Sequence, residues 1–423
     1  MMLARLVPHD TLFLPDGASF NKDDFGRSIA ASAFPPLPHQ VFSAIRLAIA
    51  HALGATIPPG GRWNPEDPMK LLWVGAKLGD IVGDGMSDLG CLRLDRLGVT
   101  TGDGKVWLPC PNIVPSATNG SRLRQFSGEA AGTVQWEGVR SDLNHLSQES
   151  RFIGNAESAH ESISMGLFIR DSALARLCED PTAVLSGIEF RNESELFATE
   201  NYVGLELDSA KANIPGQLYN IAHRRGTTSL VGRESSVSCR LRLDLPQENS
   251  EALMSSLIGR VIGGQLGGRG RSVSVQFAYE GKSVGLVEPE GFPNSAFRVR
   301  IYATAPSILG PNVVRELRSG EAYLGVAGAR LISAVHSRPR RYSAWNSDAG
   351  SRTDWIWILP TGAVFDVQIT NDSALEEMKE RLHSQGLNLL RDVDQNKRSR
   401  QMGFGDFEIG AAVSHTARNG ATE

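Results

Sequence analysis

Apolar and polar residues alternate near the start of the chain, and apolar residues then recur at helical spacing. The segment Leu3–Leu14 reads as an extended strand that breaks at Pro15-Asp16-Gly17. A proline-rich stretch, 34–38, leads into a predicted helix, and Gly54 stands where that helix should end. The apolar positions of the helix recur every four residues, at Val41, Ile45, Ile49 and Leu53. The pattern therefore predicts a strand followed by an amphipathic helix.

The second half of the chain repeats this combination of strands and helices. Residues 237–245 alternate strictly, as expected of a half-buried strand, and Ser250 is a plausible N-cap for a helix whose apolar stripe reaches Val261. Alternating strands follow at 273–279 and 297–301, and a helix at 374–385 and a strand at 404–413 could complete the unit. Strand, helix, strand, strand is the first part of a ferredoxin-like βαββαβ unit, and an RRM sheet has the same order. We predict an α+β fold of tandem ferredoxin-like (RRM-like) domains with long insertions.

The middle of the N-terminal half lacks this regularity. Residues 56–120 are rich in Gly, Pro and Asp, which favours a surface insertion over a binding lid. A new unit begins near Asn192, where a strand, a loop and another strand are predicted. The expected division is an N-terminal domain over 1–190 with an insertion at 56–150, and a C-terminal domain over 191–423.

Bulk composition limits the possible functions without choosing one. At 423 residues the chain is too long for one ordinary core, and a hydrophobic fraction of 41% fits a compact protein. The net charge of −4 argues against non-specific coating of nucleic acid, so any RNA contact must come from local clusters or a groove shared with other subunits. An ordinary acidic enzyme fits equally well. Four scattered cysteines and the lack of a long apolar run favour a cytoplasmic protein without a membrane segment.

Several motifs that suggest catalysis lack the context that catalysis needs. Gly281-Lys282-Ser283-Val284-Gly285 matches both G-x-S-x-G and the end of a P-loop, but no helix follows it, so a hairpin turn is the better interpretation. His160-Glu161 begins H-E-x-x-H, yet the last position is Ser164. The nine histidines are spread singly, and no tight carboxylate cluster suggests a two-metal site. We predict no catalytic residues, metal or cofactor.

Clusters of glycine and arginine carry the stronger signal. Residues 263–271 hold five glycines with Arg269 and Arg271, a composition that lets backbone amides and positive charge approach an anion, although a flexible turn would look similar. Near the C-terminus, Lys397-Arg398-Ser399-Arg400 runs into a glycine-rich segment. Basic residues, close-approach glycines and an aromatic ring are what single-stranded RNA binding needs. The alternative is that these glycines only let the final strand turn.

A third cluster, 338–345, interleaves arginines with Tyr342 and Trp345. It could clamp phosphates while its rings stack on bases. A loop anchored by its aromatic residues on a neighbouring subunit is nearly as good an interpretation. Arg224-Arg225 beside His223 is a weaker candidate of the same kind.

The N-terminal motifs resemble those of a known family, the RAMP subunit of the type III-B CRISPR (Cmr) effector complex that grips the 5′ handle of the guide RNA. That family opens with a strand reading roughly L-x-P-x-D-x-L-F-F-R-D-G-x-P-F, followed by F-P-P-x-P-x-x-x-x-G-A-[IL]-R. The chain departs from it at Pro15, Ser19 and Ser43, where the family has Arg, Pro and Gly. The matching residues are Leu6, Pro8, Asp10, Leu12, Phe13, Asp16, Gly17, Phe20, Ala44, Ile45 and Arg46.

Further family elements match at 203–208, 216–219, 263–271 and 360–365. The resemblance implies two RAMP domains and a non-catalytic RNA-binding subunit that caps the 5′ end of the crRNA in antiviral defence. Its expected partners are the crRNA 5′ handle, the large polymerase-like subunit and the adjacent backbone RAMP subunit. The predicted RNA-binding residues are Arg46, Gly268, Arg269, Arg271, Arg338, Arg340, Arg341, Arg398, Arg400, Gly403, Phe404 and Gly405. The alternative is a RAMP endoribonuclease that processes CRISPR repeat RNA, with His9 or His39 as general base.

Overall fold

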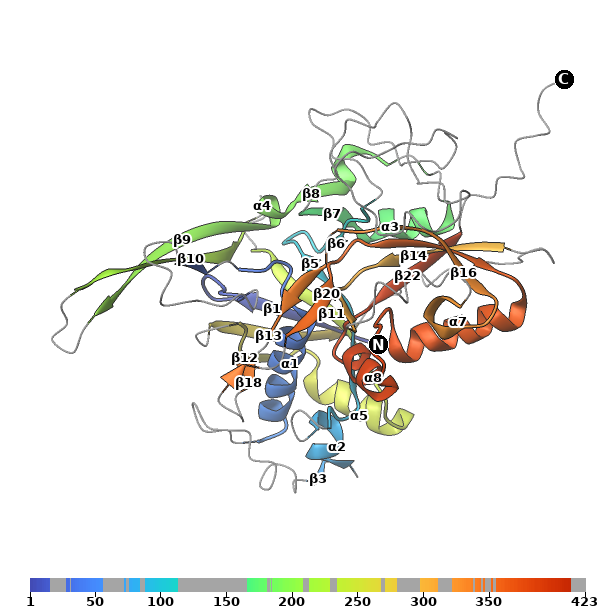
Figure 1. The fold of residues 1–423 in the computed structure, drawn as a ribbon. Coiled ribbons are helices and arrows are strands. Elements are labelled where there is room, and N and C mark those ends of the chain that lie inside the picture. The colour runs from blue at the N-terminus through green and yellow to red at the C-terminus, as the bar shows by residue number, and fades with distance from the viewer. Residues whose placement is uncertain are drawn as a thin grey trace.

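The structure combines helices with several antiparallel sheets (Figure 1). This computed structural model describes residues 1–15, 28–30, 32–55, 72–73, 76–83, 88–112, 166–180, 183, 185–207, 213–228, 234–267, 271–279, 297–310, 322–337, 339–343, 345–346, 351–352 and 355–411. No helix within these ranges is long and apolar enough to cross a membrane.

The larger of the two main sheets has eight strands, and every neighbouring pair in it is antiparallel. In spatial order they are β12 (Val261–Gln265), β13 (Ser272–Tyr279), β1 (Met2–Pro8), β11 (Ser236–Leu243), β5 (Leu92–Thr100), β6 (Val106–Pro109), β7 (Leu167–Arg170) and β8 (Phe190–Asn192). Buried residues alternate along β1, so one side of this strand faces a core. The predicted strands at 237–245 and 273–279 are therefore confirmed as neighbours of the N-terminal strand, which ends at Pro8 and not at Leu14 as predicted.

Helices cover one face of this sheet with an apolar core. They are α1 (Pro38–Ala52), α2 (Leu78–Val82) and α5 (Gln247–Leu257). The predicted stripe on α1 is confirmed, because Val41, Ile45 and Ile49 are fully buried. The helix ends before Gly54, which has a φ of +93° that favours glycine. On α5 the helix stops earlier than predicted, and Val261 begins β12 instead.

The second main sheet has four antiparallel strands, all from residues beyond 296. Their spatial order is β16 (Ala329–Val335), β21 (Val364–Ile369), β14 (Phe297–Ala303) and β22 (Phe407–Ala411). The predicted helix is present as α7 (Asp372–Gln385), which begins where the Asn371 side chain accepts a hydrogen bond from the backbone N–H of Ala374, and it packs on one face of the sheet. On the other face α3 (Asp171–Glu179) contributes to a core shared with Tyr302 and Val364.

Smaller elements complete the described chain. In Figure 1 the hairpin of β9 (Phe197–Leu207) and β10 (Asn213–Gly226) extends away from the main sheets. A three-stranded sheet has the order β15 (Ser307–Leu309), β20 (Ile356–Leu359) and β17 (Arg340–Tyr342). The others are β2 (Ser28–Ala30), β3 (Leu72–Trp73), β4 (Ala76–Lys77), β18 (Trp345–Asn346), β19 (Ser351–Arg352), α4 (Glu193–Leu196), α8 (Val393–Gln401) and the 3₁₀ turns Gly187–Glu189 and Tyr323–Gly325.

Two expectations about organisation need correction. Strands β11 and β13 were expected to lie within the C-terminal domain, but they flank β1 in the first sheet. The division between the two main sheets thus does not fall at 190/191. In addition, the insertion predicted at 56–150 contains β5, a buried strand between β11 and β6. The glycines and aspartates around β5 obscure a nine-residue strand, whose residues Leu92, Leu94, Leu97 and Val99 are all buried in the core of the first sheet.

Candidate RNA-binding surface

The predicted arginines fall into two groups, and those of the first group are engaged within the protein. Arg400, in the last turn of α8, has only 4% of its surface exposed. Its guanidinium lies 2.7 Å from an Asp95 carboxylate oxygen and 2.8 Å from one of Asp406. A buried arginine held by two carboxylates cannot contact RNA directly, so the role expected of Arg400 is replaced by a structural one.

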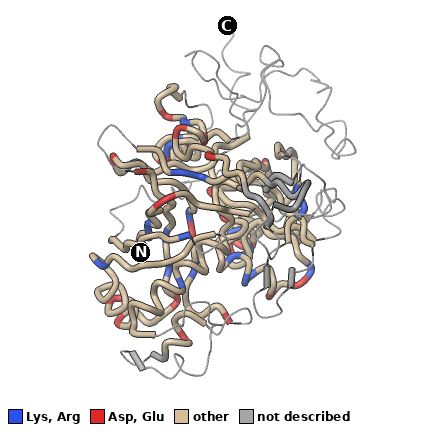
Figure 2. Tube along the Cα trace, turned by 90° about the vertical axis from the view of Figure 1, so that its left-hand side faces the viewer, with Lys and Arg blue, Asp and Glu red and all other residues tan. Residues whose placement is uncertain are grey.

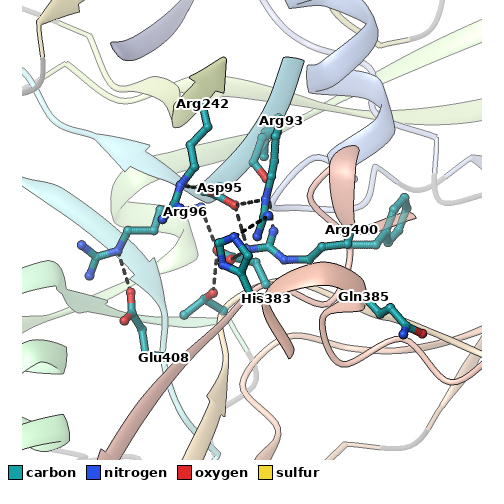
Figure 3. A network of polar contacts seen from close by, with 12 residues as sticks. Arg93, Asp95, Arg96, Arg242, His383, Gln385, Arg400 and Glu408 are labelled. Atoms are coloured by element: carbon teal, nitrogen blue, oxygen red, sulfur yellow. Dashed lines mark hydrogen bonds and ion pairs between the residues drawn. The ribbon is translucent and has the colours of Figure 1, made fainter. Parts of the chain in front are cut away.

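Arg400 belongs to a buried polar network that joins the two main sheets (Figure 3). Asp95, on β5, also pairs with Arg93 at 3.3 Å and with Arg242, on β11, at 2.7 Å. Burial opposes ionisation of Asp95, but the positive charges of Arg400, Arg93 and Arg242 outweigh it and hold the pKa of this carboxyl below its usual value. Asp95 is therefore ionised at neutral pH and holds α8 against β5.

Arg96 forms the second half of the network. It pairs with Glu408 on β22 at 2.8 Å and with Asp171 on α3 at 2.5 Å. Burial raises the pKa of Glu408 to about 7, although the nearby Arg96 acts in the opposite direction. Arg96 thus connects the first sheet to β22 of the second sheet and to α3, which packs on that sheet.

The glycine-rich segment after α8 is likewise packed against the protein. Gly403 has a φ of +99°, and a Cβ there would lie 2.5 Å from Leu94 Cδ2. Gly405 has a φ of +70°, and a Cβ there would lie 2.7 Å from the backbone nitrogen of Leu387. Phe404, between them, is 2% exposed. These glycines allow close packing inside the protein, and Phe404 cannot stack on a base from this position.

Two further predicted arginines also have internal partners. The Arg46 side chain donates hydrogen bonds to the backbone oxygens of Val82 and Asp88, so it holds the segment after α2. Arg271 lies 3.8 Å from Asp10, which also pairs with Arg225 at 2.8 Å. Three other predicted residues, Gly268, Arg269 and Arg338, lie outside the described residues.

The second group is exposed. Arg340 and Arg341 lie on β17, and Arg398 lies on α8. Within the described ranges no carboxylate pairs with any of the three. An arginine without a carboxylate partner can bind a phosphate without first breaking an ion pair. Among the described residues, these three are the predicted arginines that are exposed and have no carboxylate partner.

An apolar cluster joins the two predicted segments that carry these arginines. Phe404, from the glycine-rich segment, packs with Tyr342 of β17 and Ile358 of β20. The hydroxyl of Tyr342 lies 2.8 Å from Nε2 of His39, and the His39 ring stacks on Phe404 with 5.9 Å between the ring centroids. The segments around Tyr342 and Phe404, far apart in sequence, thus share one support. It also includes the first turn of α1.

Sequence reasoning missed two aromatic residues at this three-stranded sheet. Trp357 lies on β20 and is 41% exposed, and Trp355, directly before β20, is 50% exposed. The Arg341 guanidinium carbon lies 5.1 Å from the centre of the Trp357 ring. The alternation W-I-W-I in the sequence was a signal that could have located them.

The two histidines considered as a general base lie in different surroundings. Nε2 of His9 is 2.6 Å from the hydroxyl of Ser274, whereas His39 contacts Tyr342 and burial lowers its pKa to about 4. The structure does not bring the two together. Among the described residues there is no group of three or more His, Cys, Asp or Glu side chains arranged to hold a metal ion.

Charged residues of both signs are interspersed along the trace (Figure 2). Residues 4–412 match a family described as CRISPR-associated protein (Cas_Cmr3). A match over almost the whole chain defines the class as a CRISPR-associated protein. The chain belongs to the Cmr3 family, a family of CRISPR effector-complex subunits. The resemblance found in the sequence is thereby confirmed.

No curated protein sequence matches the chain. Among solved structures, it is similar to chains in two cryo-EM structures of the type III-B Cmr-beta complex bound to cognate target RNA, one of them also with AMPPnP. Both share 11% identity at a TM-score of 0.46, with 95% and 96% of this chain and 94% and 96% of those chains covered. A chain of the Csm3-Csm4 subcomplex of the type III-A interference complex shares 11% identity at a TM-score of 0.34, with coverage of 88% and 94%.

Proposed function

We propose that this protein is a non-catalytic subunit that binds the 5′ handle of the crRNA in a type III-B Cmr complex. One observation carries the proposal: Arg340, Arg341 and Arg398 are exposed, lack carboxylate partners in the described structure, and belong to two segments supported by a common apolar cluster. A surface of this kind suits the phosphates of a single RNA strand. The proposed partners are the crRNA, the large polymerase-like subunit and the adjacent backbone RAMP subunit, in the cytoplasm.

We also propose that the fold is a tandem pair of ferredoxin-like RAMP domains. The strand order β13-β1-β11-β5 in the first sheet and β22-β14-β21-β16 in the second supports this, because both follow the 4-1-3-2 order of a βαββαβ unit. In the first unit α1 and α5 are the two helices, and residues between β5 and β11 are an insertion. The C-terminal domain then begins near β14, and the N-terminal domain takes in residues 236–279.

The mixed charge distribution predicts that the subunit alone binds RNA weakly. With a net charge of −4, few phosphates can be neutralised at once, so affinity for handle RNA should increase when neighbouring subunits complete the groove. The isolated chain should show a shallow dependence of affinity on salt. Nanomolar affinity with a steep salt dependence for the free subunit would contradict the composite groove.

The test compares handle RNA binding by the assembled complex containing wild-type subunit with binding by the complex containing the triple variant Arg340→Ala, Arg341→Ala and Arg398→Ala. Affinity should fall, and the slope of log K against log salt should become shallower by about 0.7 for each phosphate that is no longer neutralised. Arg260→Ala is the matched control. Arg260 is exposed, but it lies beside β12 of the eight-stranded sheet, whereas Arg340 and Arg341 lie on the three-stranded sheet. Equal affinity and slope for the triple variant and the control would contradict the proposed surface.

A further inference from the structure

We propose that Trp355 and Trp357 form a stacking site for unpaired bases of single-stranded RNA, beside the arginines that bind its phosphates. This inference rests on the proposed function and names the part of the RNA that the same surface takes. Single exposed apolar residues are common on proteins, but two exposed indoles, one on β20 and one directly before it, are not accounted for by the packing of the described chain.

The site is rigid because the opposite face of its sheet is packed. Side chains alternate along a strand, so Ile356 and Ile358 point to the face of β20 opposite Trp357. Ile358 is 8% exposed and packs in the cluster with Tyr342 and Phe404. Strand β20 is also hydrogen-bonded on both sides, to β15 and to β17. A stacking surface held this way loses little conformational entropy when a base binds.

Arg341 and Trp357 are already arranged for this chemistry. They are direct partners across the β17–β20 pair, with the guanidinium carbon 5.1 Å from the ring centre. A guanidinium is planar, so it can lie against an aromatic ring on one side and a base on the other while its N–H edge reaches a phosphate. Arg340, the neighbouring residue on β17, pairs with Ile358 and therefore points to the opposite face, so Arg341 is the β17 arginine on the face of Trp357.

Charge complementarity favours RNA over a protein partner at this surface. Among the described residues, neither Arg340 nor Arg341 has a carboxylate partner, in contrast to Arg225, Arg271 and Arg400. Positive charge next to exposed rings matches a polyanion that carries flat bases. Stacking is tolerant of sequence, since every base has a π-face.

The test replaces each tryptophan by a residue that keeps either its aromaticity or only its apolar character. In the assembled complex, Trp357→Leu should weaken binding of handle RNA roughly 5- to 150-fold, the loss expected for one base–aromatic stack, whereas Trp357→Phe should retain most of the affinity. The same pair of substitutions at Trp355 should behave alike. The slope of log K against log salt should stay unchanged, because stacking releases no counterions.

A second measurement uses handle RNAs in which one base at a time is removed to leave an abasic sugar. Removing the stacked base should weaken binding to the wild-type complex and should have no further effect on the Trp→Leu complex. Melting temperatures of all variants should agree with wild type, since both side chains are largely outside the core. The stacking site would be overturned if the Trp→Leu complex lost affinity equally for every RNA, whichever base had been removed.

The outcomes separate this inference from the proposed function. If the triple arginine variant loses RNA affinity but Trp→Leu does not, the surface binds RNA and the stacking site is wrong. If neither changes RNA binding, the proposed RNA surface itself is wrong. If Trp→Leu lowers the yield of assembled complex, but the complex that does assemble keeps wild-type RNA affinity, this face docks on a protein, and the inference is overturned.

Discussion

The backbone N–H of Arg96 donates a 2.7 Å hydrogen bond to the carboxylate of Asp406, and this contact joins the two main sheets at a strained residue. Arg96 has a φ of +49°, which is unfavourable for a residue with a Cβ. It lies opposite the point where the β5–β11 register shifts, between Ser238 and Arg240. The resulting bulge re-aims the Arg96 side chain toward the second sheet, a common use of bulges.

Replacing Arg400 should destabilise the fold and not act first on RNA binding. Arg400→Met leaves the buried carboxylates of Asp95 and Asp406 without one of their counter-charges, and breaking a buried pair in this way costs about 3–5 kcal/mol. Chemical denaturation measures this loss. Arg398→Met, two positions away and exposed, is the control and should change the free energy of unfolding by less than about 0.5 kcal/mol. Equal stabilities would contradict the structural role.

Alanine at Gly405 should cost more stability than alanine at Gly259. Both glycines have positive φ, but a Cβ at Gly259 meets nothing within 4 Å, whereas one at Gly405 would lie 2.7 Å from a backbone nitrogen. Gly259→Ala should therefore lose roughly 1–2 kcal/mol for its backbone conformation alone. Gly405→Ala should lose about 1–3 kcal/mol beyond that because of the clash. Matching unfolding midpoints would show that the segment relaxes around the new methyl group.

The buried Glu408 should make stability depend on pH. Its folded pKa of about 7 lies above the usual value of 4.5, so the folded protein binds more protons than the unfolded chain between these pH values. Stability from this group is fully present below about pH 4.5 and is lost as pH rises to 7. Glu408→Gln should remove this decline, as measured by unfolding at several pH values, whereas exposed Glu376→Gln should keep it. An unchanged pH profile in Glu408→Gln would mean that Arg96 keeps the carboxylate ionised throughout.

Purified protein should leave CRISPR repeat RNA uncut, with or without divalent metal. His39, whose pKa burial lowers to about 4, is a weak base, and its ring contacts Tyr342 and Phe404. Incubation with end-labelled repeat RNA tests this directly. Cleavage that persists through stringent purification and disappears in His9→Ala or His39→Ala would favour the endoribonuclease instead.

The local pattern of apolar residues was sufficient to predict helices and strands that bury one apolar face. The four-residue spacing from Val41 to Leu53 predicted α1, and strict alternation predicted β11, because a helix or strand with one apolar face has few other ways to bury it. The motifs around Leu6 and Arg46 were also sufficient for the family. These properties are encoded within short stretches of chain.

Only the tertiary structure decided which strands share a sheet and which arginines are exposed and not held in buried ion pairs. Antiparallel pairing of β1 with β11 and β13 joins segments more than 200 residues apart, and nothing in the local pattern of 237–279 distinguishes that arrangement from a start of the second unit. Arg398 and Arg400 look alike in sequence. Because two residues rotate a helix by about 200°, Arg400 points at Asp95 while Arg398 stays exposed on another side of α8. Ion pairs depend on distances of a few ångströms between remote side chains, and only the folded chain sets those distances.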